Sequence, residues 1–294
     1  ALTSVSFPNR LRNIEKSSSS ITPAIGMYAF DGLNTLSSIT FEEISAAAPA
    51  GQMNIGDYAF RGTSVVNLEF PDYMGGSVGY QEHGGGELAY PAVGKYAFAN
   101  CEKLETVDFG NPNAERYYIG TSAFENCVNL GKNGEALVLP DALSLSSSAM
   151  GKSAFKNCTS LKEVIFSGFG STSGSTGVFE GCTSLEKVTL TGKKVYQYAL
   201  IVVGSSWFKG CYNLKEINLP GTLSAIGANA FYGCTSLTSF TLPAACVTVV
   251  STAFTDCTAL TGIEVDPDNR TIRSVDGVLY KLTDGEIKEL ILYP

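Results

Sequence analysis

The cysteines are the residues of this chain with the most chemical potential, since thiolates bind metals, form disulfides and attack substrates. The chain has eight cysteines but a single histidine, His83, and no two cysteines are spaced as Cys-x-x-Cys. A zinc site, or a Cys-His or Ser-His-Asp arrangement, would therefore depend on His83, which precedes three glycines. The sequence also lacks a phosphate-binding Gly-x-x-x-x-Gly-Lys loop. We therefore expect no enzyme, no cofactor and no metal.

Three oxygen-bearing side chains near the C-terminus, Asp266, Asp268 and Asn269, are of the type that calcium prefers. They do not follow the Asp-x-Asp-x-Asp-Gly pattern of a calcium loop. Asp and Asn also favour turns, because their short side chains bond to the backbone two residues on. We expect these three residues to form a turn.

Most of the cysteines share one position in a repeated phrase, three residues after a phenylalanine. Leu33 and Thr63 fill that position in two further copies, so it takes a small or medium buried side chain. Side chains at one position of stacked strands, ~4.8 Å apart, point the same way, whereas a disulfide needs converging Cβ atoms at ~3.8 Å. We therefore expect free, buried thiols at Cys101, Cys127, Cys158, Cys182, Cys211, Cys234 and Cys257.

The repeated phrase organises the whole chain, and its clearest copy spans residues 226–243. The phrase alternates apolar and polar residues before a proline, which predicts a short strand, and its Ala-Phe-x-x-Cys part predicts one helical turn. A unit this small buries its apolar face only against its neighbours, which predicts a solenoid. The marker phenylalanines are Phe30, Phe60, Phe98, Phe124, Phe155, Phe179, Phe208, Phe231 and Phe254, the last three 23 residues apart.

These residues resemble the BspA-type leucine-rich repeat family, whose signature is Ile-Gly-x-x-Ala-Phe-x-x-Cys-x-x-Leu-x-x-Val-x-Leu-Pro. The likeness extends over nearly the whole chain. We expect an α/β, right-handed leucine-rich repeat solenoid of about ten rungs, with short parallel strands, short helical turns and a C-terminal β-hairpin cap. The solenoid is expected over residues 1–265 and the cap, continuous with it, over 266–294. The insertion at 72–92 is expected to be either a tolerated loop or a functional one.

Composition narrows the classes of partner. The chain has 294 residues and a formal net charge of −8, with a pI near 4.8. An acidic surface argues against nucleic acid, because nucleic-acid binding depends on neutralising phosphates. No apolar run reaches the ~18 residues of a membrane span. We expect a macromolecular partner, a protein or glycoprotein, and the sequence does not indicate an oligomeric state.

Two surface features are candidate protein contacts. Val138 and Ile165 are apolar residues on the outward face of neighbouring predicted strands, beside Asp108 and Glu163, and a small apolar patch with an acidic rim is typical of a protein contact. A self-contact or a packed insertion explains the patch equally well. The second feature is Tyr28, Tyr58 and Tyr96, at one position of three neighbouring repeats. They predict an aromatic stripe for a glycan or a protein, or simply local packing.

The resemblance also implies a function. Proteins of the BspA type are typically exported by anaerobic bacteria and bind host matrix proteins, glycoproteins or other cells. We therefore expect a cell-surface or secreted adhesion protein, in an extracellular or outer-surface location. The alternatives are a structural spacer or accessory module of a larger surface protein and, less favoured, an accessory to glycan processing.

Overall fold

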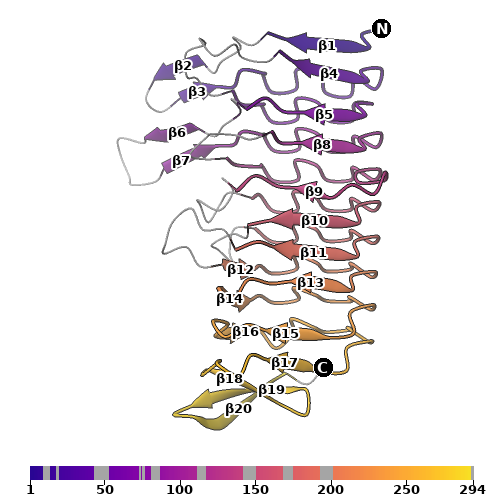
Figure 1. Cartoon of the computed structure of the whole chain (residues 1–294). Helices are drawn as coiled ribbons and strands as arrows, with labels where there is room; N and C mark the ends of the chain where they lie inside the picture. The colour runs from indigo at the N-terminus through magenta and orange to yellow at the C-terminus, as the bar shows by residue number, and fades with distance from the viewer. Residues whose placement is uncertain are drawn as a thin grey trace.

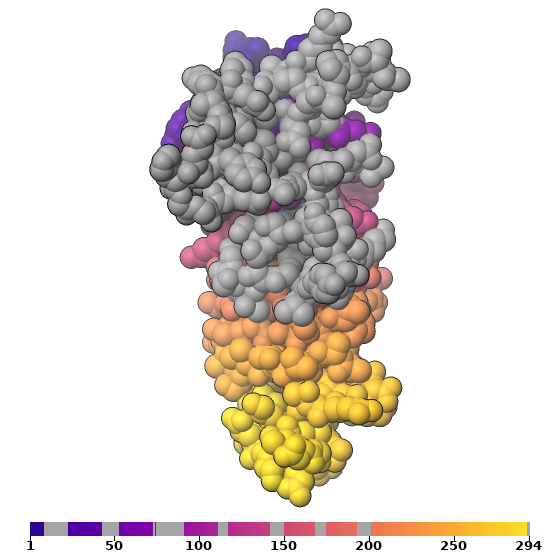
Figure 2. Space-filling model, turned by 90° about the vertical axis from the view of Figure 1, so that its left-hand side faces the viewer, coloured from indigo at the N-terminus to yellow at the C-terminus, as the bar shows by residue number. Residues whose placement is uncertain are grey.

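The computed structural model is an elongated stack that runs from the N-terminus at one end to the C-terminus at the other (Figure 1). Figure 2 shows the same stack from the side. The structure describes residues 1–8, 14–17, 20–42, 53–72, 74, 77–80, 87–110, 117–141, 150–167, 175–192 and 201–292.

One wall of the stack is made of short parallel strands. Paired strands are in register, so that Val5 lies opposite Ile39 and Val164 opposite Val188. Burial alternates along most of these strands, so that the central Ile39 of β4 and Leu68 of β5, and Phe240 and Leu242 on either side of the exposed Thr241 of β15, point into the core. The strands of this wall are β1 (Ser4–Phe7), β4 (Ser38–Phe41), β5 (Asn67–Glu69), β8 (Thr106–Asp108), β9 (Leu137–Val138), β10 (Glu163–Phe166), β11 (Lys187–Leu190), β13 (Glu216–Asn218), β15 (Phe240–Leu242) and β17 (Ile263–Val265).

A second wall contains the strands β12 (Ile201–Val203), β14 (Leu223–Ile226) and β16 (Thr248–Val249), which form one parallel sheet. Single parallel bridges extend this wall through Ile25, Ile55, Val93, Ile119 and Met150. Each of these five residues precedes a glycine of the repeated phrase. A Cβ added to the glycine after Met150, Gly151, would lie 2.2 Å from the backbone nitrogen of Thr121. At Gly56, Gly94, Gly120 and Gly151 the backbones of neighbouring rungs therefore approach so closely that only glycine fits, whereas Gly26 has nothing within 4 Å.

The segment around each marker phenylalanine is a series of turns, and the predicted helical turns are wrong: the described residues contain no α-helix. The backbone amides of alternate residues donate to different partners, either the next rung or a carbonyl three residues back in the same rung. The amides of Tyr28, Phe30 and Gly32 donate to carbonyls of the next rung, whereas those of Ala29 and Asp31 donate three residues back. Tyr28 and Gly32 have φ of 58° and 69°. These left-handed residues interrupt a helix and turn half of the amides toward the neighbouring rung.

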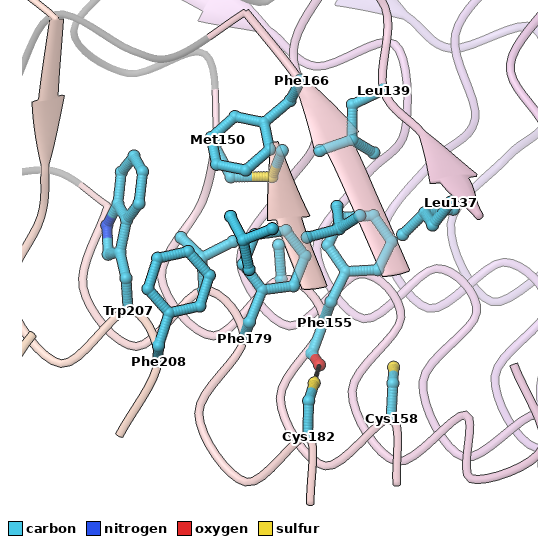
Figure 3. Close-up of a cluster of buried hydrophobic side chains, with 14 of the residues drawn as sticks. Leu137, Leu139, Met150, Phe155, Cys158, Phe166, Phe179, Cys182, Trp207 and Phe208 are labelled. Carbon is cyan, nitrogen blue, oxygen red and sulfur yellow. Dashed lines mark hydrogen bonds between the residues drawn. The ribbon is translucent and has the colours of Figure 1, made fainter. Parts of the chain in front are cut away.

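The marker phenylalanines form a continuous column of rings through the core. Each ring stacks on the next, with centroids 5.0 Å apart for Phe30 and Phe60 and 5.7 Å apart for Phe179 and Phe208. Aliphatic residues of the strand wall close the other side of the column, as Figure 3 shows for Leu137 and Leu139. The core is therefore one cluster that extends along the stack, as expected when each repeat buries its apolar face against its neighbours.

The cysteines of the shared position lie beside this column, and all eight cysteines of the chain are free and buried. Their thiols do more than fill space. The Cys182 Sγ lies 3.2 Å from the Phe155 carbonyl oxygen of the preceding rung, the hydrogen bond drawn in Figure 3. Cys101, Cys127, Cys158, Cys211, Cys234 and Cys257 make the same bond to the phenylalanine before. The position thus favours a weak donor in addition to a small volume, which a size argument alone missed.

The strand wall is divided into four blocks, β1–β4, β5–β8, β9–β10–β11–β13 and β15–β17. The first strand of each later block is followed by a proline, at Pro71, Pro140 and Pro243. At the same place Thr191 donates its N–H to the Phe166 carbonyl of the preceding rung. Proline has no N–H to donate, so each break loses one inter-strand bond. The strand wall is therefore no continuous ladder, and the count of about ten rungs stays a prediction.

Within the described residues, antiparallel strands occur at three places. The hairpins β2 (Ile14–Ser17) with β3 (Ser20–Thr22) and β6 (Ser77–Tyr80) with β7 (Glu87–Tyr90) lie to one side of the stack in Figure 1. The second hairpin lies in the 72–92 insertion. The strands β18 (Ile272–Val275), β19 (Val278–Thr283) and β20 (Glu286–Leu292) form an antiparallel sheet after the last parallel strand. Asp276 and Gly277, with φ of 52° and 82°, make its first turn, as the Asp-Gly pair predicts.

Candidate functional site

No metal site is apparent in the part of the chain that the structure describes, where no three His, Cys, Asp or Glu side chains come together. His83 lies outside the described residues. The Asp266 Oδ1 accepts the Asp268 N–H at 2.9 Å. The Asn269 Oδ1 accepts the N–H groups of Thr271 and Ile272 at 2.9 Å. These oxygens are used in holding a turn, so the interpretation of this trio as turn-forming residues is confirmed.

The apolar pair of the strand wall is brought together by strand register. Ile165 of β10 lies directly opposite Val138 of β9, and the Leu139 N–H donates to the Ile165 carbonyl at 2.9 Å. The Val138 side chain is 55% exposed, and Ile165 is half-buried. Thr189 of β11 continues the row on the far side of Ile165. The two side chains thus form a small apolar patch on the otherwise polar outer face of the strand wall.

The expected acidic rim is of mixed charge. The Lys187 ammonium lies 3.3 Å from the Glu163 carboxylate and 3.7 Å from that of Glu216. The hydrogen bond from Lys187 to Glu163 and the nearby carboxylates raise the pKa of Lys187. Asp108 lies on β8, across the break that precedes β9, and its Oδ1 accepts the Gly110 N–H at 2.8 Å. One flank of the apolar pair therefore carries a paired carboxylate and the other an exposed one.

The three tyrosines of the second candidate form a stack. The rings of Tyr28 and Tyr58 are 4.8 Å apart at an interplanar angle of 3°, and those of Tyr58 and Tyr96 are 5.0 Å apart at 9°. Their inner faces are covered by one another, so the stripe presents ring edges rather than open faces along most of its length. Desolvation and the neighbouring phenols raise the pKa of Tyr58. This arrangement favours the local-packing explanation over a flat platform for a sugar ring.

The backbone at the tyrosines is unusual for bulky residues. Tyr28, Tyr58 and Tyr96 have φ between 55° and 60°, in the left-handed region. Other rungs fill this position with smaller residues, among them Ser122 and Asn229, and asparagine adopts this region at less cost than tyrosine. Ring stacking offsets part of that cost at the tyrosine rungs. The preference for tyrosine at three successive rungs is therefore a surface feature of the first half of the stack.

Arg61 fixes the edge of the tyrosine stack. Its guanidinium carbon lies 4.8 Å from the Tyr58 ring centroid. The same guanidinium donates two hydrogen bonds to the Asp31 carboxylate, at 2.8 and 2.7 Å. These bonds raise the pKa of Arg61. The cation is thus held between a carboxylate and an aromatic face of neighbouring rungs.

A cleft that the sequence did not single out lies between β13 and β15. It has a volume of about 500 Å³ and is bordered by polar side chains of both strands, including Asn218 and Thr241, with Asp266 at one end. The signals that could have located it are Pro243, which cannot bond back to the preceding rung, and Phe240, which stands where other strands have Val, Ile or Leu.

Comparisons with known proteins agree with the repeat pattern. The model of the BspA type leucine rich repeat region matches residues 1–75, 89–200 and 193–276, with six copies. No curated protein matches. The described residues include no helix long and apolar enough to cross a membrane.

Several solved structures are similar at low identity. A leucine rich cell surface protein from Faecalibacterium prausnitzii has 19% identity and a TM-score of 0.38, over 90% of this chain and 79% of that one. The leucine rich repeat protein of T. pallidum has 23% identity and a TM-score of 0.42, over 68% and 77%. The pneumococcal vaccine antigen PcpA has 17% identity and a TM-score of 0.36, over 93% and 53%. By its family match, this chain belongs to the BspA-type leucine-rich repeat family.

Proposed function

We propose that this protein is an exported binding and adhesion protein, secreted or held at the outer cell surface, that contacts a macromolecular partner through its strand wall. Membership of the BspA-type family supports a surface or protein-interaction role. The partner we propose is a host matrix protein, a glycoprotein or another cell. Binding rather than catalysis carries this function, since repeats create an extended surface rather than a closed pocket.

The observation that carries the proposal is the apolar pair of Val138 and Ile165. The two residues lie side by side on β9 and β10, outward from the core. Next to them the Lys187 ammonium bridges Glu163 and Glu216. An apolar centre with charged groups at its edge is the usual layout of a protein contact. The net charge of −8 favours a neutral or basic partner.

A double substitution tests this proposal. Val138→Lys with Ile165→Glu should abolish binding to immobilised fibronectin, laminin or collagen, whichever the native protein binds. The melting temperature should change little, because both side chains point outward. Thr40→Lys, an exposed residue of β4 on the same wall, is the matched control and should keep binding. A large loss of stability would mean that the patch is covered, and unchanged binding would place the site elsewhere, with the tyrosine stack next.

The alternative is a structural spacer that presents another domain. The elongated form of the stack (Figure 1) supports this alternative. We also propose that the array has about ten rungs over residues 1–265 and that the antiparallel sheet within 266–294 caps it. Ile272, Leu279 and Leu292 of that sheet are buried with the repeat core, which supports a capping role. A spacer would bind none of the matrix proteins tested.

A further inference from the structure

The strand wall opens between β13 and β15 in a way that leaves backbone groups without partners. The two strands belong to different sheets. Where neighbouring strands pair, the residue two positions after the central one donates its N–H to the next rung, as Phe70 does to the Asp108 carbonyl and Leu139 to the Ile165 carbonyl, whereas at the break between β8 and β9 the N–H of Phe109 has no backbone acceptor within the described residues. The equivalent N–H of Leu219 has no acceptor within the described residues. Unpaired strand edges are templates for pairing with another chain.

Pro243 and Phe240 account for the opening. Pro243 occupies the position from which Asp266, one rung later, donates to the Leu242 carbonyl, and proline has no such N–H. Phe240 replaces the aliphatic residue found in the neighbouring strands, and its ring packs 4.8 Å from that of Phe254 and 5.3 Å from that of Phe231. A ring in this place needs more room than a Val or Ile side chain.

Proline alone does not produce a cleft of this size, as two other rungs show. Pro220 follows β13, yet β13 pairs with β11. There the charged side chains of Lys187 and Glu216 join the two strands, and so do the side chains of Asn218 and Thr189, 3.4 Å apart. Such cross-strand pairs stabilise a sheet. Pro140 follows the break between β8 and β9, where the space is only about 40 Å³, enough for water alone.

The cleft between β13 and β15 is bounded at both ends by backbone hydrogen bonds that join the two rungs. At one end the Ser236 N–H donates to the Tyr212 carbonyl at 3.1 Å, and at the other the Val247 N–H donates to the Ser224 carbonyl at 3.0 Å. Between these bonds the cleft has a volume of about 500 Å³. Its floor includes Ile217, which is half-buried although the equivalent Val188 is fully buried. The cleft therefore offers an apolar floor between two strand edges.

We propose that this cleft binds a short extended segment of a partner protein by β-strand addition, with a basic side chain at its Asp266 end. Backbone groups of the segment pair with the unpaired edges, and alternate side chains enter the cleft. At ~3.3 Å per residue, about four residues match the length of the short strands. The lining carries the carboxylates of Glu216 and Asp266 and a single cation, Lys215, which is itself paired with Glu186 at 3.4 Å.

The site is independent of the apolar pair on β9 and β10, and the cleft chemistry argues for a peptide rather than a glycan. Unpaired N–H and C=O groups in a row match the repeat of a polypeptide backbone. Within the described residues that line the cleft, Phe240 is the sole aromatic residue, and its ring is buried in the core. No aromatic face is thus available there for a sugar.

The test uses the full chain and two synthetic peptides, acetyl-Lys-Thr-Val-Thr-Val-amide and the same peptide N-methylated at alternate residues. The first should bind saturably and slow hydrogen exchange of the Leu219 amide by about tenfold. The N-methylated peptide cannot pair along one edge and should not bind. Pro243→Thr restores an N–H that can donate to the Leu219 carbonyl, as Asp266 does to the Leu242 carbonyl. It should therefore let β15 close onto β13, which protects the Leu219 amide without peptide and weakens peptide binding at least ~10-fold.

Pro220→Thr is the matched control, since β11 and β13 are already paired, and it should bind the peptide as the native protein does. Val138→Lys with Ile165→Glu should also keep peptide binding, which separates this proposal from the adhesion proposal. The inference is overturned if the native protein does not bind the peptide at millimolar concentration. It is equally overturned if the N-methylated peptide binds as well, or if Pro243→Thr protects the Leu219 amide and leaves binding unchanged.

Discussion

Replacing Phe231 with alanine should strongly destabilise the stack. Its side chain is fully buried, and its ring stacks on Phe208 at 5.5 Å and on Phe254 at 5.1 Å, with Phe240 against its side at 5.3 Å. A buried Phe→Ala change costs ~3–5 kcal/mol, since it loses the transfer free energy of the ring and leaves a cavity. Phe231 contacts three rings, and each aromatic pair contributes ~0.5–1.5 kcal/mol, which is included in that total. The loss for Phe231→Ala should therefore lie in the upper half of the ~3–5 kcal/mol range.

The measurement is the free energy of unfolding from urea titrations followed by circular dichroism, with the slope of the transition recorded for each variant. Phe30→Ala is the matched control. The Phe30 ring occupies the same position of the phrase but is half-buried, and it stacks on one ring, Phe60, with Phe7 at its edge. Phe30→Ala should therefore lower the free energy of unfolding by about 1–2 kcal/mol. Equal losses for the two variants, or a loss below ~1 kcal/mol for Phe231→Ala, would refute the view that the ring column holds the rungs together.

Two further predictions concern backbone approach and pH. Gly151→Ala should destabilise the protein by ~1–3 kcal/mol in the same urea assay, because the new Cβ would meet the Thr121 backbone at 2.2 Å. Gly26 holds the same position of the first phrase, and a Cβ added there would have nothing within 4 Å. Gly26→Ala should therefore change the free energy of unfolding by less than ~0.5 kcal/mol. Burial raises the pKa of the Cys246 thiol from 9.0 to about 11, so the unfolded chain ionises first and stability present below pH 9 is lost between pH 9 and 11. The loss from this thiol is about 3 kcal/mol, and Cys246→Ala should flatten the pH profile by that amount.

The strand wall and the core could be predicted from the sequence because both follow from spacing. Once the repeats are aligned on their phenylalanines, Val138 and Ile165 fall opposite one another, and the register of β9 and β10 confirms it. The same alignment places Glu163 beside Lys187, which the structure joins at 3.3 Å. That ion pair was therefore available from the sequence, and the expectation of an acidic rim overlooked it.

The turns were not predictable in the same way. Three-residue and four-residue spacings of Ala, Phe and Cys fit a helical turn as well as they fit a series of tight turns. The deciding feature is the left-handed φ of residues such as Tyr28 and Tyr58, and tyrosine does not indicate that conformation. The inter-rung bonds that favour it depend on a neighbouring rung, so they are a property of the stack and not of the local sequence.

The cleft escaped prediction because prolines in equivalent positions have different outcomes. Pro220 and Pro243 both end a strand of the same wall, yet only the strand before Pro243 separates from its neighbour. The difference comes from Phe240 and from the side-chain pairs between β11 and β13. Neither influence can be weighed until the register is known.

The two sides of the stack differ in mechanical behaviour. Around the marker phenylalanines, amides bond from one rung to the next from Tyr28 to Gly233, whereas the strand wall is joined only within four blocks. A rod with a continuous row of bonds on one side and interrupted bonds on the other bends most easily by spreading the interrupted side. The turn side then acts as the hinge line, and curvature changes at Pro71, Pro140 and Pro243. A stack of this kind can follow the contour of a large, uneven surface while its core stays intact.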